Sequence, residues 1–247
     1  MAAVRTQALV IRSVDVFESS RVLTLFTRDL GKVSALAKGA RRLRSPFQSA
    51  LDLLSVCDIV LLHKGSDALD LLTEAVLLER FGALARDLPS LYAGYYVGEL
   101  LSELTQHHEP HPRLFESAVV TLRHLDDPEL RTRRISRFEL ACLRELGVMP
   151  ALDVCVGCGR LMDEQGEAVA FGLATGGVLC PSCRPGHTFV ATLSGTTLRA
   201  LRVLSSPGSA WRAPEWRAVA DGPVRETLGA VISHHLGARP RLLSWLS

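Results

Sequence analysis

The first third of the chain alternates short apolar runs with turn residues. Runs rich in Val, Ile, Leu and Thr are separated by Ser, Asp and Gly, which is the spacing of strands rather than of helices. The predicted strands are Val4–Val14, Val22–Thr27, Lys32–Ala37, Val56–His63 and Ala68–Val76. Five strands within the first 76 residues leave little room for helices, so the pattern predicts a small Greek-key barrel, the OB-fold.

From Leu77 onward the apolar residues recur with helical spacing, and Leu, Ala, Glu and Arg dominate. Helices are predicted over 77–88, 90–106, 113–125, 130–146, 193–205 and 223–237. Between the fourth and fifth helices lies a Gly-rich stretch with four cysteines, too irregular for a helix. The sequence therefore predicts an α+β protein with an OB-fold domain (1–79), an α-helical domain (80–150 and 190–247) and an inserted four-cysteine module (151–189).

The composition is that of a folded globular protein without a membrane span. The chain has 247 residues, 47% of them apolar and 22% charged, which excludes wholesale disorder. The longest stretch without a charge, Ala168–Cys183, is too short to cross a bilayer and is broken by glycines and a proline. No secretion signal is recognisable at the N-terminus, so we expect a cytoplasmic protein with reduced cysteines.

Two Cys-x-x-Cys pairs, Cys155 with Cys158 and Cys180 with Cys183, are separated by 21 residues. Such pairs let four thiolates converge on one tetrahedral zinc ion, and glycines in the first pair suit its tight turn. A redox couple is the alternative, but a thioredoxin-like motif has one such pair rather than two. Because four cysteines fill the coordination shell, the prediction is one structural Zn²⁺ ion and no metal-activated catalysis.

Positive charge is concentrated near the N-terminus. Residues 1–44 contain nine basic and three acidic residues, whereas residues 45–116 contain four basic and eleven acidic ones. The cations around the third predicted strand and the loop after it are Arg28, Lys32, Lys38, Arg41, Arg42 and Arg44. We expect this segment to bind nucleic-acid phosphates, with a merely solvated surface loop as the alternative.

Alternation along the third strand directs Lys32 and Ser34 to one face, and Val33, Ala35 and Ala37 to the face that lines the barrel. Three aromatic residues of this region, Phe17, Phe26 and Phe47, are candidates for stacking on bases. A buried position is favoured for Phe26, and Phe47 is compatible with either role.

A second group of arginines opens the predicted helix 130–146. The group consists of Arg131, Arg133, Arg134 and Arg137, and the apolar face of the same helix consists of Ile135, Phe138 and Cys142. These arginines are a candidate second site for DNA or an acidic partner, and a solvated helix start is an equal alternative.

Sequence motifs of common enzyme classes are missing. Gly31-Lys32 lacks the rest of a phosphate-binding loop, and the chain has neither an HExxH nor a GxSxG motif. No nucleophile with a base and an orienting residue can be named, so the prediction is that the protein is not an enzyme.

Three segments together resemble the bacterial RecO recombination mediator family. They are Gly31-Lys32 with Lys38–Arg42 and Ser45; Arg137–Leu140 leading to Gly147, Pro150 and Cys155-x-x-Cys158-Gly159; and Gly176–Cys180-x-x-Cys183. They occur in the order typical of the family and cover most of the chain.

The resemblance implies an N-terminal OB-fold, an α-helical domain and a zinc module. It also implies binding of single- and double-stranded DNA, annealing of strands coated with single-stranded DNA-binding protein, and, with the partner RecR, help in loading RecA at the nucleoid. Carried over by position, the DNA contacts are Lys32, Lys38, Arg41, Arg42 and Arg44, and the zinc ligands are Cys155, Cys158, Cys180 and Cys183.

Two other functions fit the residues. A zinc-stabilised adaptor would use the acidic segment 45–116 and the arginines of 131–137 to bind proteins only. An OB-fold RNA-binding factor is the other, because backbone contacts on a barrel do not by themselves separate RNA from DNA.

Overall fold

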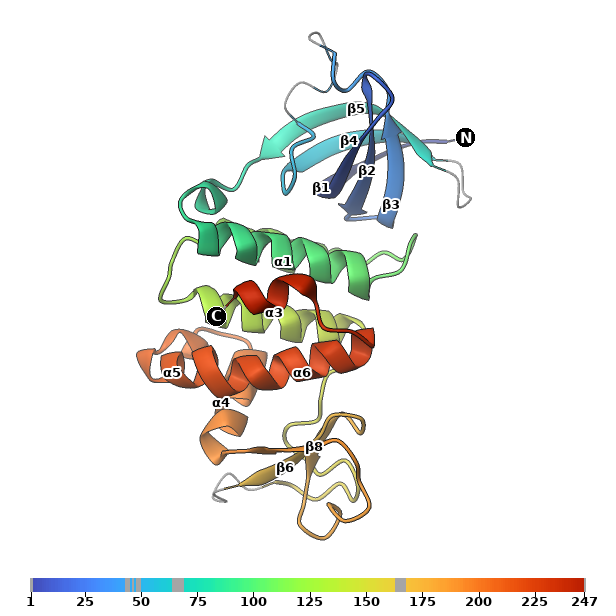
Figure 1. Cartoon of the computed structure of the whole chain (residues 1–247). Helices are drawn as coiled ribbons and strands as arrows, with labels where there is room; N and C mark the ends of the chain where they lie inside the picture. Colours follow the sequence, from blue (N-terminus) through green and yellow to red (C-terminus); the bar gives the residue numbers. More distant parts are fainter. Residues whose placement is uncertain are drawn as a thin grey trace. The chain divides into compact units, whose positions relative to one another are not determined.

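The computed structural model describes residues 2–42, Ser45, Phe47, 50–63, 69–162 and 168–246. Its contacts divide the chain into two compact units, Met1–Asp126 and Asp127–Ser247 (Figure 1). The first unit contains a β-barrel and two helices, and the second contains the other helices and a small sheet.

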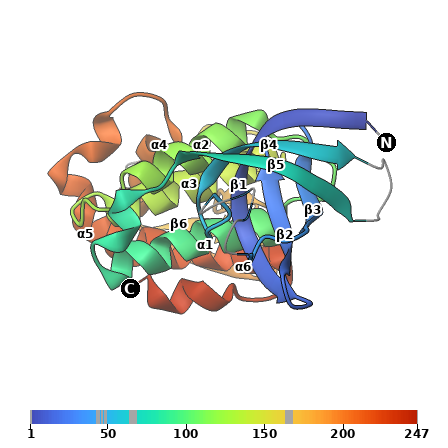
Figure 2. The same ribbon diagram turned by 90° about the horizontal axis from the view of Figure 1, so that it is seen from above.

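The five predicted strands close into a barrel (Figures 1 and 2). They are β1 (Ala2–Val16), β2 (Ser20–Thr27), β3 (Gly31–Ala37), β4 (Val56–His63) and β5 (Asp70–Glu79). Their order is β1-β2-β3-β5-β4, with β3 and β5 parallel and the other neighbours antiparallel. This five-stranded Greek-key barrel is the OB-fold, so the predicted fold class is confirmed.

The barrel closes because β1 is long enough to pair with two neighbours. Its N-terminal part pairs with β4 and its C-terminal part with β2, and the register with β2 shifts between Val10 and Arg12. Such a bulge bends a strand and increases its twist. The predicted alternation of β3 is confirmed, since Val33, Ala35 and Ala37 are buried in the barrel core.

Two helices follow the barrel. A 3₁₀ turn, η1 (Gly82–Ala85), leads into α1 (Leu88–Leu104), and α2 (Pro112–Arg123) comes next. α1 begins where the Asp87 carboxylate accepts a hydrogen bond from Ser90 N (2.7 Å). The predicted helix over 77–88 is wrong, because Ala75 and Leu77 still pack on the barrel core and keep β5 extended to Glu79.

The second unit is built on α3 (Arg131–Glu145), α4 (Gly195–Ser205) and α6 (Arg225–Leu236). The predicted apolar face of α3 is confirmed, because Ile135, Phe138 and Cys142 are buried. Short helical elements lie between α4 and α6 and after α6: η2 (Ala210–Arg212), η3 (Pro214–Trp216), α5 (Arg217–Val219), the π-helical η4 (Ala220–Val224) and η5 (Arg241–Trp245).

The segment between α3 and α4 contains a three-stranded antiparallel sheet. Its strands are β6 (Val169–Gly172), β7 (Gly177–Leu179) and β8 (Val190–Leu193), in the order β7-β6-β8. The predicted domains group segments by type of secondary structure, whereas the contacts place α1 and α2 in one unit with the barrel. The division into three domains stays a prediction. None of the helices in the described ranges is long and apolar enough to cross a membrane.

An ion pair is buried inside the second unit. Arg225 Nη1 of α6 donates to Glu139 Oε2 of α3 at 2.6 Å, and both side chains are almost fully buried. The desolvation of two charges offsets much of their attraction, so such a pair adds little net stability. It instead penalises any packing of α3 against α6 that separates the two charges.

Loss of one partner is therefore expected to be more harmful than loss of both. Arg225→Leu should lower the free energy of unfolding by about 3–5 kcal/mol, because the Glu139 carboxylate stays buried without this guanidinium. The double variant Arg225→Leu/Glu139→Leu should recover most of that loss in urea denaturation. Simple addition of the two single losses would contradict this role.

Candidate nucleic-acid interface and metal site

The basic loop, residues 38–42, leaves the barrel at the end of β3. Lys38, Arg41 and Arg42 are exposed on it. Arg42 N donates to Gly39 O (3.1 Å), and Arg41 N donates to Ser19 O (3.0 Å) in the turn between β1 and β2. The second bond ties the loop to the β1–β2 hairpin, so the three cations are held on one rim of the barrel.

A carboxylate that the sequence analysis missed positions part of this rim. Asp15 accepts from Arg21 Nε at 3.0 Å and lies 3.3 Å from Arg41 Nε. Asp15 and Arg21 lie opposite each other in the β1–β2 register. A predicted hairpin between these two strands would have paired them, and such cross-strand pairs of opposite charge interact. Lys38 and Arg42 have no ion-pair partner within the described part of the chain.

Of the other predicted cations, Arg28 lies away from the basic loop, and Arg44 is not among the residues that the structure describes. Arg28 is exposed, and its Nε lies 3.2 Å from Glu116 Oε1 of α2. Exposed pairs of this kind contribute only about 0–1 kcal/mol, so a phosphate can replace the carboxylate at little cost.

Lys32 differs from the other cations because it is buried. Its Nζ donates to Thr105 O (2.6 Å) and to Ser102 O at the C-terminal end of α1. The last carbonyls of a helix lack partners within the helix and carry partial negative charge, so the ammonium satisfies them. Burial lowers the pKa of Lys32, against an opposing effect of the Glu103 carboxylate. This placement gives Lys32 a role in the fold and does not support the predicted DNA contact.

The three candidate aromatic residues also separate. Phe26 is fully buried, and its ring stacks with that of Phe115 at 6.4 Å between centroids. Phe47 is buried in the barrel core. Phe17, in the β1–β2 turn, is 86% exposed, so it is the one of the three whose ring can reach a base.

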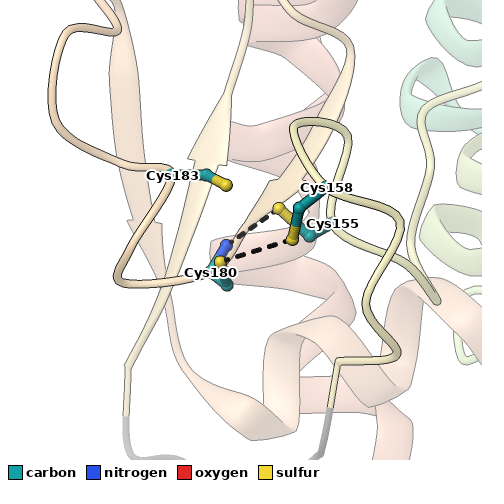
Figure 3. Close-up of side chains that lie close together, drawn as sticks. All are labelled: Cys155, Cys158, Cys180 and Cys183. Carbon is teal, nitrogen blue, oxygen red and sulfur yellow. Dashed lines mark hydrogen bonds between the residues drawn. The ribbon is translucent and has the colours of Figure 1, made fainter.

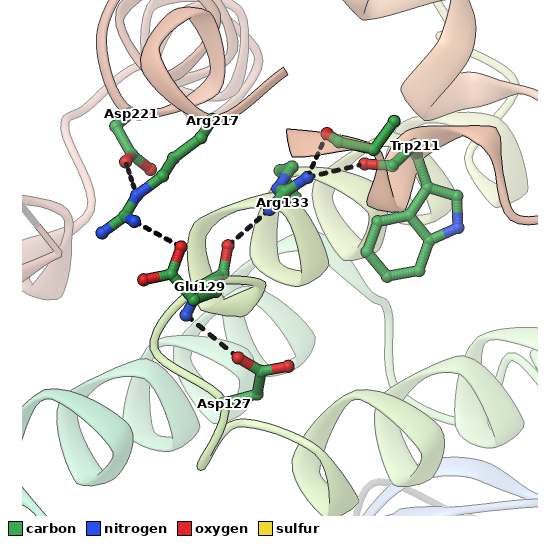
Figure 4. Close-up of polar contacts among 7 residues, drawn as sticks. Asp127, Glu129, Arg133, Trp211, Arg217 and Asp221 are labelled. Atoms are coloured by element: carbon green, nitrogen blue, oxygen red, sulfur yellow. Dashed lines mark hydrogen bonds and ion pairs between the residues drawn. The ribbon is translucent and has the colours of Figure 1, made fainter. Parts of the chain in front are cut away.

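In the second arginine group, Arg133 is buried. It donates to Glu129 O (2.6 Å), Ala213 O (2.7 Å) and Trp211 O (3.2 Å), as Figure 4 shows for the start of α3. Burial lowers the pKa of Arg133. The guanidinium attaches the start of α3 to residues 211–213. Its Nε makes no hydrogen bond to the described residues but is buried, so Arg133 offers a phosphate no accessible donor.

The other arginines of this group are partly exposed. Arg134 and Arg137 have their Cζ atoms 5.5 and 5.1 Å from the centroid of the Trp211 ring. Arg137 also donates to Leu204 O (2.7 Å) and Ser206 O (2.8 Å). Cation–π contacts and these hydrogen bonds hold the end of α4 and the segment after it against α3. Arg131 is partly exposed at the first position of α3.

The four predicted metal ligands come together (Figure 3). All four sulfurs lie within 4.8 Å of one another, and Cys158 Sγ is 3.8 Å from Cys180 Sγ. Metal–sulfur bonds of about 2.3 Å in a tetrahedron require sulfurs about 3.8 Å apart. Cys155, Cys158, Cys180 and Cys183 can therefore hold one metal ion, and all are free cysteines.

The electrostatics of the cluster favour a cation. Cys180 N donates to Cys155 Sγ (3.3 Å), and this bond is the main cause that lowers the pKa of Cys155 to about 6. Hydrogen bonds with the sulfurs of Cys180 and Cys158 raise the pKa of Cys183 to about 12. Four adjacent thiolates repel one another, so full deprotonation at neutral pH requires a bound cation.

Two glycines make the first turn of the cluster feasible, for different reasons. Gly159 has a φ of +73°, as the sequence analysis expected of a knuckle turn. At Gly157 the reason is space, because a Cβ there would lie 2.9 Å from Cys183 Cβ.

Two family models together match almost the whole chain. The model described as Recombination protein O N terminal matches residues 1–81, and Recombination protein O C terminal matches residues 85–244. The chain belongs to the RecO family. The first RecO model covers the barrel with its basic loop, and the second covers α1 to α6 with the four cysteines.

Individual relatives confirm the resemblance. A DNA repair protein RecO of Rhodopirellula baltica is 45% identical over 199 residues, which cover 81% of this chain and 74% of that protein. The DNA repair protein RecO of Anaeromyxobacter sp. (strain K) is 41% identical over 241 residues, 97% of this chain and 94% of the relative. The DNA repair protein RecO of Myxococcus xanthus is 33% identical over 240 residues, with 97% and 95% covered.

Lys32→Met and Lys38→Met form a matched pair that separates fold from interface. Lys32→Met should lower the free energy of unfolding by about 1–3 kcal/mol, because two buried carbonyls lose their donor, and should leave the DNA affinity of the folded protein unchanged. Lys38→Met should leave stability unchanged and reduce the slope of log affinity against log salt by about 0.7 for single strands.

Urea denaturation and fluorescence anisotropy with a labelled oligonucleotide measure the two properties. A Lys32→Met protein of normal stability that no longer binds DNA would instead support the predicted contact between Lys32 and DNA.

Proposed function

We propose that this RecO-family protein acts in DNA repair by binding single- and double-stranded DNA and annealing complementary strands. The observation that carries the proposal is the set of exposed cations, Lys38, Arg41 and Arg42, held on one rim of an OB-fold barrel. The relatives named DNA repair protein RecO support the repair role.

The chemistry of the rim suits the backbone of DNA. Exposed guanidinium and ammonium groups bind phosphates without reading bases, and each contact releases a condensed counterion. Two complementary strands repel each other through their phosphates, so a surface that neutralises part of this charge on both strands favours their pairing. Sequence-independent annealing follows from these contacts.

The family resemblance supports the partners. With RecR, the protein would promote loading of RecA on strands coated with single-stranded DNA-binding protein, in the cytoplasm at the nucleoid. Arg28 lies at the opposite end of β2 and β3 from the basic loop, so it would be a separate DNA contact. The partly exposed Arg131, Arg134 and Arg137 form a proposed second surface for DNA or a protein partner.

The protein would perform this function without catalysing a covalent reaction. Annealing needs charge neutralisation and alignment only, and the four-cysteine cluster offers a metal no open coordination position. Zn²⁺ is the proposed ion, because four thiolates in a tetrahedron match its preference. Its role would be to join the turn at Cys155 to the turn at Cys180 and so stabilise the fold around β6 to β8.

Charge reversal on the basic loop tests the DNA surface. Arg41→Glu/Arg42→Glu should weaken binding of a single-stranded oligonucleotide about tenfold or more and reduce the salt slope by about 1.4, because two phosphate contacts are lost. The same variant should lose most of its acceleration of annealing between strands coated with single-stranded DNA-binding protein.

Arg5→Glu/Arg86→Glu is the matched control, because it changes the net charge equally at two exposed arginines of other elements. Equal loss of affinity in both double variants would show that net charge, not the rim, attracts DNA. Unchanged affinity of the Arg41→Glu/Arg42→Glu variant for the oligonucleotide would contradict the proposed interface. Stronger competition by RNA than by DNA would favour an RNA-binding factor.

Elemental analysis tests the metal. Freshly purified protein should contain about one zinc per chain, and Cys158→Ser/Cys183→Ser should contain none and unfold at lower temperature. Cys57→Ala, at a buried thiol outside the cluster, should keep its zinc. Metal-free protein that folds as stably as the zinc-loaded form would contradict a structural role for the ion.

A further inference from the structure

The turn between β1 and β2 presents an apolar ring to solvent. Phe17 opens this turn, and its side chain is 86% exposed, more than any other large apolar side chain among the described residues. An exposed phenyl ring gains nothing from the hydrophobic effect in the folded chain. The ring is therefore available for contact with another molecule.

The backbone conformation at Phe17 also indicates a functional role for this residue. Its φ is +53°, in the left-handed region where Gly or Asn is the ordinary residue of a hairpin turn. A bulky side chain in this region is strained by about 1–3 kcal/mol, and such strain is concentrated at functional sites. The turn therefore keeps a phenylalanine where a glycine would stabilise the hairpin better.

Cations, the carboxylates of Asp15 and Glu18, and a hollow lie at or beside this turn. The bond from Arg41 N to Ser19 O attaches the basic loop to the turn, and Asp15 holds the guanidinium groups of Arg21 and Arg41 beside it. A hollow on the same hairpin is lined by Ser13–Asp15, Arg21 and Leu51–Leu53. An aromatic ring, positive charge and a partly apolar hollow thus occur within one rim of the barrel.

We propose that Phe17 stacks on an unpaired base of single-stranded nucleic acid while the basic loop contacts the adjoining phosphates. This inference rests on the proposed DNA-binding function and adds a base contact to it. A nucleotide carries a flat π-face and an anionic phosphate close together, which matches a phenyl ring beside guanidinium groups. The β1–β2 loop is also one of the loops by which OB-folds contact oligonucleotides.

The contact would favour single strands over duplex. Bases in a duplex are already stacked and paired, so Phe17 can reach them only after they are unstacked. The cations of the basic loop, in contrast, bind phosphates of either form. Phe17 would thus make the protein prefer single strands without any sequence readout.

Substitution of Phe17 tests the contact. Phe17→Ala should weaken binding of a labelled oligothymidylate about 5- to 100-fold at every salt concentration, with an unchanged salt slope, because stacking releases no counterions. Affinity for a duplex of equal length should not change. Phe17→Trp should bind single strands normally, and its added tryptophan fluorescence, relative to the parent protein, should be quenched on binding.

Phe189→Ala is the matched control. Phe189 is also a phenylalanine with positive φ (+55°) and is 74% exposed, but it belongs to the second unit. Its substitution should change neither affinity.

Two results would overturn the stacking contact: single-strand binding by Phe17→Ala equal to that of the parent, or an equal loss for single strand and duplex. If Arg41→Glu/Arg42→Glu still weakens binding in those cases, only the stacking contact is wrong. If that variant also binds normally, the proposed DNA surface itself fails.

Discussion

The hydrogen bonds of Lys32 to the end of α1 determine which cations of the N-terminal unit a ligand can reach. β3 carries this lysine at its start, and the ammonium satisfies Ser102 O and Thr105 O, which no helical N–H reaches. One buried charge thus joins the barrel to the helix that follows it. Because protein covers Lys32 at this end of β3, the cations of the proposed rim are those at the other end, where the basic loop meets the β1–β2 turn.

In the second unit, too, some charged side chains are buried and stabilise the fold, and others are exposed. Arg133 satisfies three backbone carbonyls, and Arg225 is paired with Glu139 inside the core. Neither group is free to bind a ligand without disruption of its unit. The surface is therefore less basic than the number of arginines in the sequence suggests. The proposed function depends on the cations that remain exposed.

Much of this could be predicted from the sequence, because the relevant signals are local. Five short apolar runs separated by turn residues predicted the barrel, and the spacing of the Cys-x-x-Cys pairs predicted the metal cluster. Burial of Lys32 could not be predicted, since alternation shows that a residue faces away from the barrel core but not that α1 covers that face. Likewise, leucines and alanines at 75–84 fit helix and strand equally well, and only packing on the barrel core extends β5 to Glu79.

The proposed function depends on DNA binding at the rim formed by the β1–β2 turn and the basic loop. Hydrogen–deuterium exchange of the unsubstituted protein, with and without a single-stranded oligonucleotide, tests this directly. We expect slower exchange in peptides that contain residues 17–21 and 38–42, with little change in peptides of β6 to β8. Protection confined to the second unit, with the two rim segments unchanged, would contradict it.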